Sequence, residues 1–343
     1  MLKFKKLIQA SAITAALLAS GSAFSATTLH VGTWLPAGNP QNAVVWPTWA
    51  RWVEEATEGR VTVKMEYDLG HPKTLFQLVE DGVVDAGFSY HGYVPGRFRL
   101  PQIVEQPGLG ANAEAASVGL WRVYSKYFAD AGEFDGLELL GMFTHGPGYI
   151  HTIEPISSLE DMKGKKIRIG GGVQSDIGEL MGITPVAAPA PKVYEMLQQG
   201  VVDGVFMPMA EQKVLRLNEV AKNVTMVPGG MYLGSFSMFI NPDFLADLDE
   251  QDREAIMSVS GEKLSALAGK AWDGSDAEGY ETAKAEGVTL VELGDDDAMT
   301  QAFRDMTSGL GQKWIDSVSD MDVDAEAAMA ELKAIVADYQ PAE

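Results

Sequence analysis

Apolar residues recur in the same pattern at two places along the chain, 118 residues apart. In residues 75–88 and again in residues 193–206, apolar side chains first come at positions i, i+3 and i+4, which predicts a helix that buries one face. A glycine follows each predicted helix, Gly82 and Gly200, where the end of a helix favours a positive φ. Each segment then continues as Val-Val-Asp and an apolar run, which predicts a short buried strand. Five of the fourteen positions are identical. Unless the match is chance, the pattern predicts two similar α/β lobes.

Further periodic segments agree with alternating strands and helices. Strands are predicted for residues 29–34, 61–67, 165–169 and 288–293, and helices for residues 45–56 and most of 243–285 and 296–338. Such alternation is typical of open sheets with helices on both faces, where ligands bind beyond the carboxyl ends of the strands. Ser89, Tyr90 and Met207 follow the two repeated strands. We therefore expect them to line a cleft shared by the two lobes.

The composition of the chain narrows its possible functions. Asp and Glu number 48 against 26 Lys and Arg, and the formal charge of −22 opposes binding to nucleic acid or to an anionic membrane. The sequence has no cysteine, which excludes disulfides, thiolate metal sites and cysteine nucleophiles. An apolar content of 46% is that of a globular protein, and 343 residues suffice for two lobes.

The first 25 residues have the features of a secretory signal peptide. Three lysines near the start precede an apolar run over residues 10–18 and a small-residue ending at Ser25. The apolar run is too short to span a membrane, and no other stretch reaches about 18 apolar residues. We expect cleavage before Ala26 and export to a bacterial periplasm, with the loss of three lysines taking the charge from −22 to about −25.

Sequence motifs for catalysis are absent. No zinc-binding His-Glu-x-x-His, Walker loop or EF-hand loop occurs, and the five histidines have no i, i+2 or i, i+4 pairing. The acidic run at residues 295–297 precedes a predicted helix and is explained as its N-terminal cap. We therefore expect no catalytic residue, metal or cofactor. The competing class is a periplasmic hydrolase or isomerase with His91 or His145 as its base.

A binding site is indicated instead around Arg168. This arginine stands at the end of a predicted strand and is followed by glycines at 170–172. Glycine lets the backbone approach a ligand closely, and successive N–H groups can bind an anion, so Gly171 is a candidate ligand contact. The guanidinium matches a carboxylate or sulfonate with two parallel hydrogen bonds. The alternative is a surface arginine on a basic strand edge, since three lysines lie nearby.

Several segments carry a resemblance to a known family. They are D-M-K-G-K-K-I-R-I at 161–169, G-I-T-P at 182–185, V-Y-E-M-L-Q-Q-G-V-V-D-G at 193–204, Y-V-P-G-R-F at 93–98 and P-G-L at 107–109. Together they resemble the substrate-binding proteins of tripartite ATP-independent periplasmic (TRAP) transporters. The resemblance extends from about residue 28 to about residue 335. The combination of D-x-K-G-x-K-x-R with V-D-G is specific in an exported protein of this length.

This resemblance implies a two-lobed periplasmic binding protein fold of the α/β class. Its open mixed sheets are flanked by helices, a long helix spans both lobes, and the ligand cleft lies between them. We expect residues 1–25 to be the signal peptide, 26–145 plus 236–278 to form lobe I, and 146–235 plus 279–343 to form lobe II. The family implies a receptor that closes on a small organic anion and delivers it to TRAP membrane subunits without a nucleotide. A binding subunit for a sensor kinase is an alternative.

The resemblance also implies which residues bind the ligand, and we assign them one position at a time. The family's arginine in K-G-x-K-x-R holds the ligand carboxylate, and Arg168 occupies that place. The residue that usually reaches the ligand after the first strand is Trp34, and the pair after V-D-A-G-F is Ser89 and Tyr90. The residue before the proline that follows V-D-G is Met207, where the family often has asparagine.

The implied pocket has one charged anchor and mostly aromatic or apolar walls. A second arginine found in some members is absent, because the sequence there reads His-Gly-Pro-Gly-Tyr from His145. His145 is the candidate ligand contact from this segment. The expected wall residues are Trp34, Tyr90, Phe206, Met207, Tyr232 and Phe236, each of which could instead belong to the core. A heavily hydroxylated sugar acid would leave hydroxyls unsatisfied there. We therefore expect a keto or hydroxy acid, an aromatic acid or a small sulfonate, or else a zwitterion in an aromatic cage.

Overall fold

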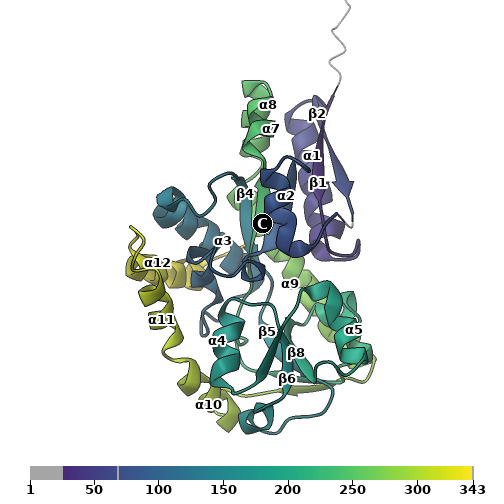
Figure 1. Cartoon of the computed structure of the whole chain (residues 1–343), viewed down its shortest axis with the longest axis vertical. Coiled ribbons are helices and arrows are strands. Elements are labelled where there is room, and N and C mark those ends of the chain that lie inside the picture. Colours follow the sequence, from purple (N-terminus) through teal and green to yellow (C-terminus); the bar gives the residue numbers. More distant parts are fainter. Residues whose placement is uncertain (1–25, 68, 342–343) are drawn as a thin grey trace, which may run out of the picture.

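The chain forms two sheets, each with its own helices, which lie one above the other in Figure 1. The structure is a computed structural model that describes residues 26–67 and 69–341. Lobe I denotes the half around the sheet of order β2-β1-β3-β10-β4, and lobe II the half around the sheet of order β11-β9-β5-β8-β6-β7. The strands are β1 (Thr27–Gly32), β2 (Val61–Glu66), β3 (Ala86–Tyr90), β4 (Glu138–Thr144), β5 (Gly148–Thr152), β6 (Lys166–Ile169), β7 (Thr184–Ala187), β8 (Gly204–Pro208), β9 (Asn223–Met226), β10 (Ser235–Ile240) and β11 (Thr289–Glu292).

Both sheets are mixed, which confirms the expected fold class. In lobe I, β1 runs parallel to β2 and β3, whereas β10 runs antiparallel to β3 and β4. In lobe II, β6 runs parallel to β7 and β8, β5 runs antiparallel to β8 and β9, and β11 runs parallel to β9. The chain passes between the lobes at residues 145–147, which join β4 to β5, and again at residues 227–234, which join β9 to β10.

The repeated sequence pattern forms the same unit in each lobe. Helix α2 (Leu75–Glu80) leads into β3, and α5 (Val193–Gln198) leads into β8. The glycines between them, Gly82 and Gly200, have φ angles of +65° and +67°. A residue with a Cβ is strained at these angles, so the glycines end the helices as predicted.

The aspartate of the repeated Val-Val-Asp joins each strand to a parallel neighbour. A side-chain oxygen of Asp85 accepts a hydrogen bond from the backbone N–H of His30 in β1 at 2.7 Å. In lobe II, Asp203 accepts in the same way from the N–H of Lys166 in β6 at 2.8 Å. The sequence identity between the repeats therefore has a structural cause, because in both lobes the carboxylate satisfies a backbone donor at the start of a strand pair.

Replacing Asp85 by alanine is expected to lower the free energy of unfolding by roughly 1–2 kcal/mol, because a partly buried N–H loses its acceptor. The matched change at the exposed Asp203 is expected to cost roughly half as much, because water can replace that acceptor. Urea unfolding of both variants measures the two costs. Equal losses would contradict the role of burial.

Helices pack against the sheets of both lobes. In the described part they are α1 (Trp46–Ala56), α2, α3 (Ala113–Val123), α4 (Val173–Leu180), α5, α6 (Glu211–Val214), α7 (Pro242–Ala246), α8 (Glu250–Ser258), α9 (Glu262–Ala285), α10 (Ala298–Thr307), α11 (Leu310–Ser317) and α12 (Ala325–Asp338). The helical region expected at 243–285 is thus divided into three helices, and that expected at 296–338 also into three. Helix α12 packs on α3, so the end of the chain returns to lobe I (Figure 1).

Helix α9 is the expected long helix that spans both lobes. It has 24 residues and packs against α3 and β4 in lobe I and against α6 in lobe II. Two of its glycines permit these contacts: a Cβ added to Gly269 would lie 2.4 Å from the carbonyl oxygen of Ala113, and one added to Gly279 would lie 2.1 Å from that of Met209. The same helix therefore lies directly against the backbone of each lobe.

The expected signal peptide, residues 1–25, lies outside the described residues. Within the described ranges, no helix combines the length and the apolar character needed to cross a membrane.

Candidate functional site

A buried cavity lies between the lobes, at the carboxyl ends of β3, β6 and β8. It is lined by Trp34, Leu35, Tyr90, Tyr93, His145, Arg168, Gly170, Gln174, Ala190, Met207, Pro208, Glu211, Tyr232, Phe236 and Trp272. The free space is about 30 Å³, which holds one or two water molecules. An organic ligand therefore enters only when the lobes separate or the lining side chains move.

Arg168 is the cation of this cavity, and its side chain is held by contacts with both lobes. It is 2% exposed. Its Nε donates to the carbonyl of Ala188 at 2.8 Å, and its Nη2 lies 3.4 Å from the hydroxyl of Tyr93 in lobe I. That hydroxyl also accepts from the N–H of Ala190 at 2.9 Å. Nη1 has no hydrogen-bond partner among residues 26–67 and 69–341. The oriented guanidinium can therefore bind a carboxylate through charge-assisted hydrogen bonds.

Aromatic rings form most of the wall on the lobe I side. The ring of Tyr90 lies edge-on to Tyr93 and tilted against Phe236, with a centroid distance of 5.1 Å in each case. Trp34 meets Tyr93 edge to face at 5.6 Å. The indole N–H of Trp34 donates to a backbone carbonyl of lobe I at 2.9 Å, so this residue presents an apolar ring to the cavity. Such walls favour an aromatic or other apolar ligand body.

Most residues expected in the site line the cavity. They are Arg168, Trp34, Tyr90, Met207, Tyr232, Phe236 and His145. Ser89 and Phe206 do not, because side chains alternate along a strand and their neighbours Tyr90 and Met207 face the cavity. The hydroxyl of Ser89 donates to the carbonyl of Pro72 at 2.8 Å, and Phe206 lies in the apolar core of lobe II. The expectation for these two residues is corrected accordingly.

The glycines after Arg168 lie against lobe I. Gly171 has a φ of +103°, and a Cβ there would lie 2.2 Å from the carbonyl oxygen of Gly92. Gly172 has a φ of +60°, and a Cβ there would lie 2.3 Å from Oε2 of Glu105. Glycine is therefore needed for the lobes to meet, and Gly171, expected to contact a ligand, is an interlobe contact instead.

Glu105 joins the two lobes across this contact. Its Oε2 accepts from the N–H of Val173, the first residue of α4 in lobe II, at 3.0 Å. Its Oε1 accepts from the N–H of Ser235 at 3.1 Å and from the Ser235 hydroxyl at 2.7 Å, both in lobe I. A second link runs from the hydroxyl of Tyr90 to the carbonyl of Gly171 at 3.1 Å. The backbone N–H of Val173, directly after the glycines, thus binds a carboxyl group of the protein itself.

Burial dominates the protonation of this polar network. It raises the pKa of Glu105 to about 7, although the hydrogen bonds from Val173 and Ser235 oppose the rise. Because the Ser235 hydroxyl donates to Glu105, it accepts from Nδ1 of His91 at 3.0 Å. The other ring nitrogen of His91, Nε2, then accepts from the hydroxyl of Ser237 at 3.1 Å. Burial lowers the pKa of His91 to about 3, so the ring is neutral at pH 7.

His145 lies at the first crossing between the lobes and faces the cavity. Its Nδ1 donates to the carbonyl of Gly146 at 2.6 Å. Burial lowers the pKa of this ring to about 4, so it is neutral at pH 7. It packs edge to face on Tyr232 at 5.4 Å. The ring therefore acts as part of the wall and adds no second positive charge beside Arg168.

Among the lining residues that the sequence reasoning misses, four have polar side-chain atoms: Tyr93, Gln174, Glu211 and Trp272. Tyr93 begins the Y-V-P-G-R-F segment, so the resemblance contains a signal for it. Glu211 follows the carboxyl end of β8 by three residues, a position from which ligand contacts are common. Trp272 has no such signal, because on a helix its apolar ring has the same spacing as core residues.

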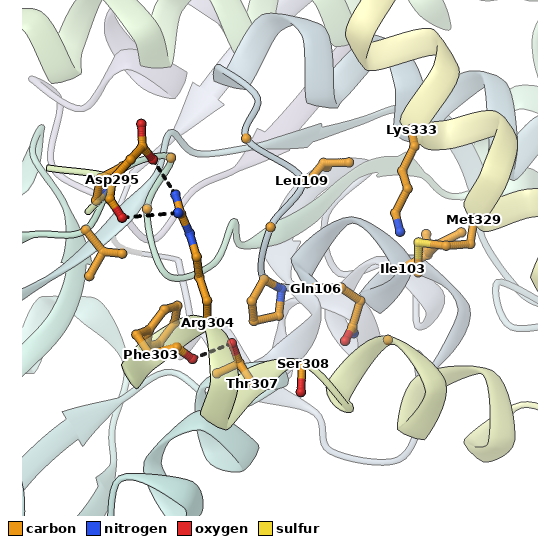
Figure 2. A pocket seen from close by; sticks show the side chains of 18 residues that line it. Ile103, Gln106, Leu109, Asp295, Phe303, Arg304, Thr307, Ser308, Met329 and Lys333 are labelled. Atoms are coloured by element: carbon orange, nitrogen blue, oxygen red, sulfur yellow. Dashed lines mark hydrogen bonds and ion pairs between the residues drawn. The ribbon is translucent and has the colours of Figure 1, made fainter. Parts of the chain in front are cut away.

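A second cavity, of about 490 Å³, opens where the segments 106–110 and 227–230 meet α10, α11 and α12. Figure 2 shows Arg304 of α10 reaching Asp295 on one side, with Lys333 of α12 on the other. The guanidinium of Arg304 is ion-paired with Asp295 and is about half exposed. Its charge is therefore already balanced, unlike that of Arg168, and Arg304 offers a control position for the main site.

The chain's family follows from comparison with known proteins. Residues 31–316 match the model for bacterial extracellular solute-binding protein, family 7. The chain therefore belongs to this family, the solute-binding proteins of TRAP transporters, as its sequence motifs and its two-lobed fold predict. Members of this family are extracellular solute-binding proteins.

Two solved structures and one sequence relative are similar over almost the whole chain. A TRAP periplasmic solute-binding protein from Bordetella bronchiseptica, with (R)- and (S)-mandelate bound, is 36% identical with a TM-score of 0.88 and covers 91% of this chain and 99% of its own. A TRAP solute-binding protein from an unidentified marine metagenome microbe, specific for aromatic acids and bound to 3-hydroxybenzoate, is 30% identical with a TM-score of 0.85, covering 92% and 99%. The outer membrane transporter protein TsaT of Comamonas testosteroni is 30% identical over 96% of this chain and 97% of its own.

Proposed function

We propose that this chain binds an aromatic monocarboxylate, with the carboxylate on Arg168 and the ring against Trp34, Tyr90 and Phe236. The observation that carries the proposal is a buried, oriented guanidinium with an unused Nη1 inside an aromatic wall. One cation balances one carboxylate, and a second carboxylate would lie buried without a partner. The acidic side chain of Glu211 in the same lining disfavours a dicarboxylate further.

The ligands of the two similar structures support this class. The Bordetella protein holds mandelate, and the marine protein holds 3-hydroxybenzoate; each of these ligands has one carboxylate and one benzene ring. Both proteins share this chain's fold over more than nine-tenths of its length. A sulfonate or a keto acid fits the single cation as well, but uses less of the aromatic wall.

The bound ligand is released unchanged in this proposal. Of the two histidines considered as a base, His145 is neutral with Nδ1 bonded to a carbonyl, and His91 lies outside the lining, between two serines. Residues 1–25 are removed before Ala26, which the mass of the exported protein tests. The proposed division places residues 26–145 plus 236–278 in lobe I and 146–235 plus 279–343 in lobe II, except that Ser235 belongs to β10 and α12 packs on α3, both in lobe I.

A calorimetric titration of refolded, ligand-free protein tests the proposal. Benzoate, 3-hydroxybenzoate and mandelate are expected to bind, each raising the unfolding free energy by about 2.7 kcal/mol at 100 times its Kd. A C4 dicarboxylate and a sugar acid are expected to bind at least tenfold more weakly. Mass spectrometry of the recovered ligand is expected to show no product. Binding of the dicarboxylate or the sugar acid alone would contradict the proposed class, and turnover would favour the hydrolase or isomerase.

A further inference from the structure

Two buried polar atoms on residues that line the main cavity have no partner within the described part of the chain. They are Oε2 of Glu211 and Nε1 of Trp272. The residues are 3% and 2% exposed. Buried polar groups are nearly always hydrogen-bonded, and an unpaired one destabilises the protein. The same cavity thus contains one acceptor and one donor that a ligand could satisfy.

The two side chains lie on one wall of the cavity, formed by α6 and α9. Glu211 is the first residue of α6, just after β8, and Trp272 is near the middle of α9. An oxygen of Asp276 in α9 accepts from the N–H of Ala210 at 2.7 Å, and Gly279 allows the backbone of this loop to lie against α9. The start of α6 is therefore fixed to the long helix α9, and Glu211 keeps its place relative to Trp272.

Glu211 does not neutralise Arg168. No ion pair within 4.0 Å joins the two side chains, although both face the cavity. Burial raises the pKa of Glu211 to about 7, and the charge of Arg168 limits that rise. A carboxyl group with these surroundings accepts a hydrogen bond readily from a ligand donor when ionised. The cavity thus has a cation for a carboxylate and a separate polar pair for another ligand group.

We propose that Glu211 and the indole N–H of Trp272 form a hydroxyl subsite, so that the ligand is a hydroxy-substituted aromatic carboxylate. This inference rests on the proposed function. A hydroxyl group is suited to the pair because it donates one hydrogen bond, to Glu211, and accepts another, from Trp272. The carboxylate of the same ligand lies on Arg168. The hydroxyl therefore satisfies both unpaired atoms in one step.

Other ligand groups satisfy the pair less well. An ammonium group would pair with Glu211 but accepts no hydrogen bond, so the N–H of Trp272 would stay unpaired. A quaternary ammonium neither donates nor accepts. A second carboxylate would accept from Trp272 but would repel Glu211. A ligand without a second polar group leaves both atoms buried and unpaired.

Matched ligand pairs measure the subsite directly. Wild-type protein, refolded to remove carried-over ligand, is titrated with each enantiomer of mandelate against phenylacetate, and with 3-hydroxybenzoate against benzoate. In at least one pair the hydroxy form is expected to bind about tenfold or more tightly than the form without the hydroxyl. Phenylglycine, with an ammonium in place of the hydroxyl, is expected to bind more weakly than mandelate.

Two variants connect that preference to the named residues. Glu211→Leu removes the acceptor and Trp272→Phe removes the donor while keeping an aromatic ring stacked beside Phe236. Each is expected to reduce the ratio of the two affinities, hydroxy form over the form without the hydroxyl, to about threefold or less. Trp46→Phe is the matched control, since Nε1 of Trp46 is also buried and unpaired within the described residues but lies outside the cavity lining, and the preference should be unchanged.

The outcomes separate the two proposals. Binding of both members of each pair with equal affinity overturns the hydroxyl subsite and leaves the aromatic monocarboxylate assignment standing. The hydroxyl subsite is also overturned if both cavity variants keep the wild-type preference while their melting curves show an intact fold. Absence of binding by every aromatic carboxylate overturns both proposals.

Discussion

Arg168→Ala is expected to weaken the binding of an aromatic monocarboxylate such as 3-hydroxybenzoate by about 30-fold to 5,000-fold, equivalent to roughly 2–5 kcal/mol. The loss is large because the carboxylate would remain buried in the closed cavity without its counter-charge. In the wild type, Nε of Arg168 is held by a carbonyl, so the guanidinium is already oriented before the ligand arrives. Isothermal titration calorimetry measures the change in Kd.

Two further variants make this result specific. Arg168→Lys keeps the charge but loses the fork geometry, so its affinity is expected to lie between those of wild type and Arg168→Ala. Arg304→Ala removes the ion-paired arginine of the second cavity (Figure 2) and is expected to leave Kd within about twofold, since a half-exposed ion pair contributes little. If Arg168→Ala bound the ligand with wild-type affinity, this result would contradict the proposal that Arg168 binds the carboxylate.

Glu105→Gln is expected to weaken ligand binding by about 5-fold to 50-fold without preventing folding. The carboxylate accepts hydrogen bonds from Val173 in lobe II and Ser235 in lobe I, whereas an amide offers one acceptor oxygen and directs N–H groups at the other donor. The closed state loses its bond across the lobes, and the open state keeps the bond within lobe I. The variant therefore makes the closed state less favourable relative to the open state, and this lowers the affinity for the ligand.

Glu133→Gln is a matched control for this effect. Glu133 is a half-buried carboxylate that also accepts from backbone N–H groups, those of Arg99 and Leu100, but all of these contacts are confined to lobe I. The variant Glu133→Gln is expected to lower the melting temperature without changing the Kd of the ligand. Small-angle scattering of ligand-bound Glu105→Gln is expected to show a larger fraction of open molecules than the wild type. Equal affinity in Glu105→Gln and wild type would remove Glu105 from the closing mechanism.

The same carboxyl group makes stability depend on pH in a definite direction. Burial raises the pKa of Glu105 from 4.5 to about 7, so the folded protein holds this proton more tightly than the unfolded chain. The unfolding free energy of wild type, relative to Glu105→Gln, therefore falls as pH rises through the window from 4.5 to about 7. The fall amounts to roughly 3 kcal/mol, since a shift of one pKa unit is about 1.36 kcal/mol. Urea unfolding of both proteins at pH 4.5, 6 and 8 measures it, and a constant difference would contradict the raised pKa.

Sequence reasoning identifies the family, the strand–helix alternation and the place of Arg168 in the cavity lining because each of these depends on local pattern. The repeated helix–glycine–strand unit is visible because the glycines and the strand-joining aspartates Asp85 and Asp203 are needed within a few residues of one another. Arg168 is visible for a similar reason, since its motif and its strand are contiguous. The place of Tyr90 and Met207 at the ends of the repeated strands also marks them, but it does not say which of two neighbouring residues faces the cleft. Ser89 and Phe206 are therefore predicted in the site as well, although they do not line the cavity.

The sequence alone does not predict contacts between segments that are far apart along the chain. Glu105 and Val173 are 68 residues apart, and neither belongs to a motif that reports the other. Gly171 and Gly172 indicate a close backbone approach, but an approach to a ligand and an approach to lobe I require the same residue type. Only the residues that pack against these glycines show whether the backbone approaches a ligand or lobe I.

By itself, the sequence determined the α/β class, the two lobes, the family and the presence of Arg168 in the cavity lining, because motifs, hydrophobic periodicity and turn residues act over short distances along the chain. The tertiary structure alone decided that Glu211 and Trp272 share a cavity with Arg168 and that Glu105 links the lobes. The first arrangement arises because α9 lies against both lobes, and the second because Glu105 bonds Val173 of α4 and Ser235 of β10. A carboxylate at such a place is indistinguishable in sequence from one on the surface, and only its burial gives it a role.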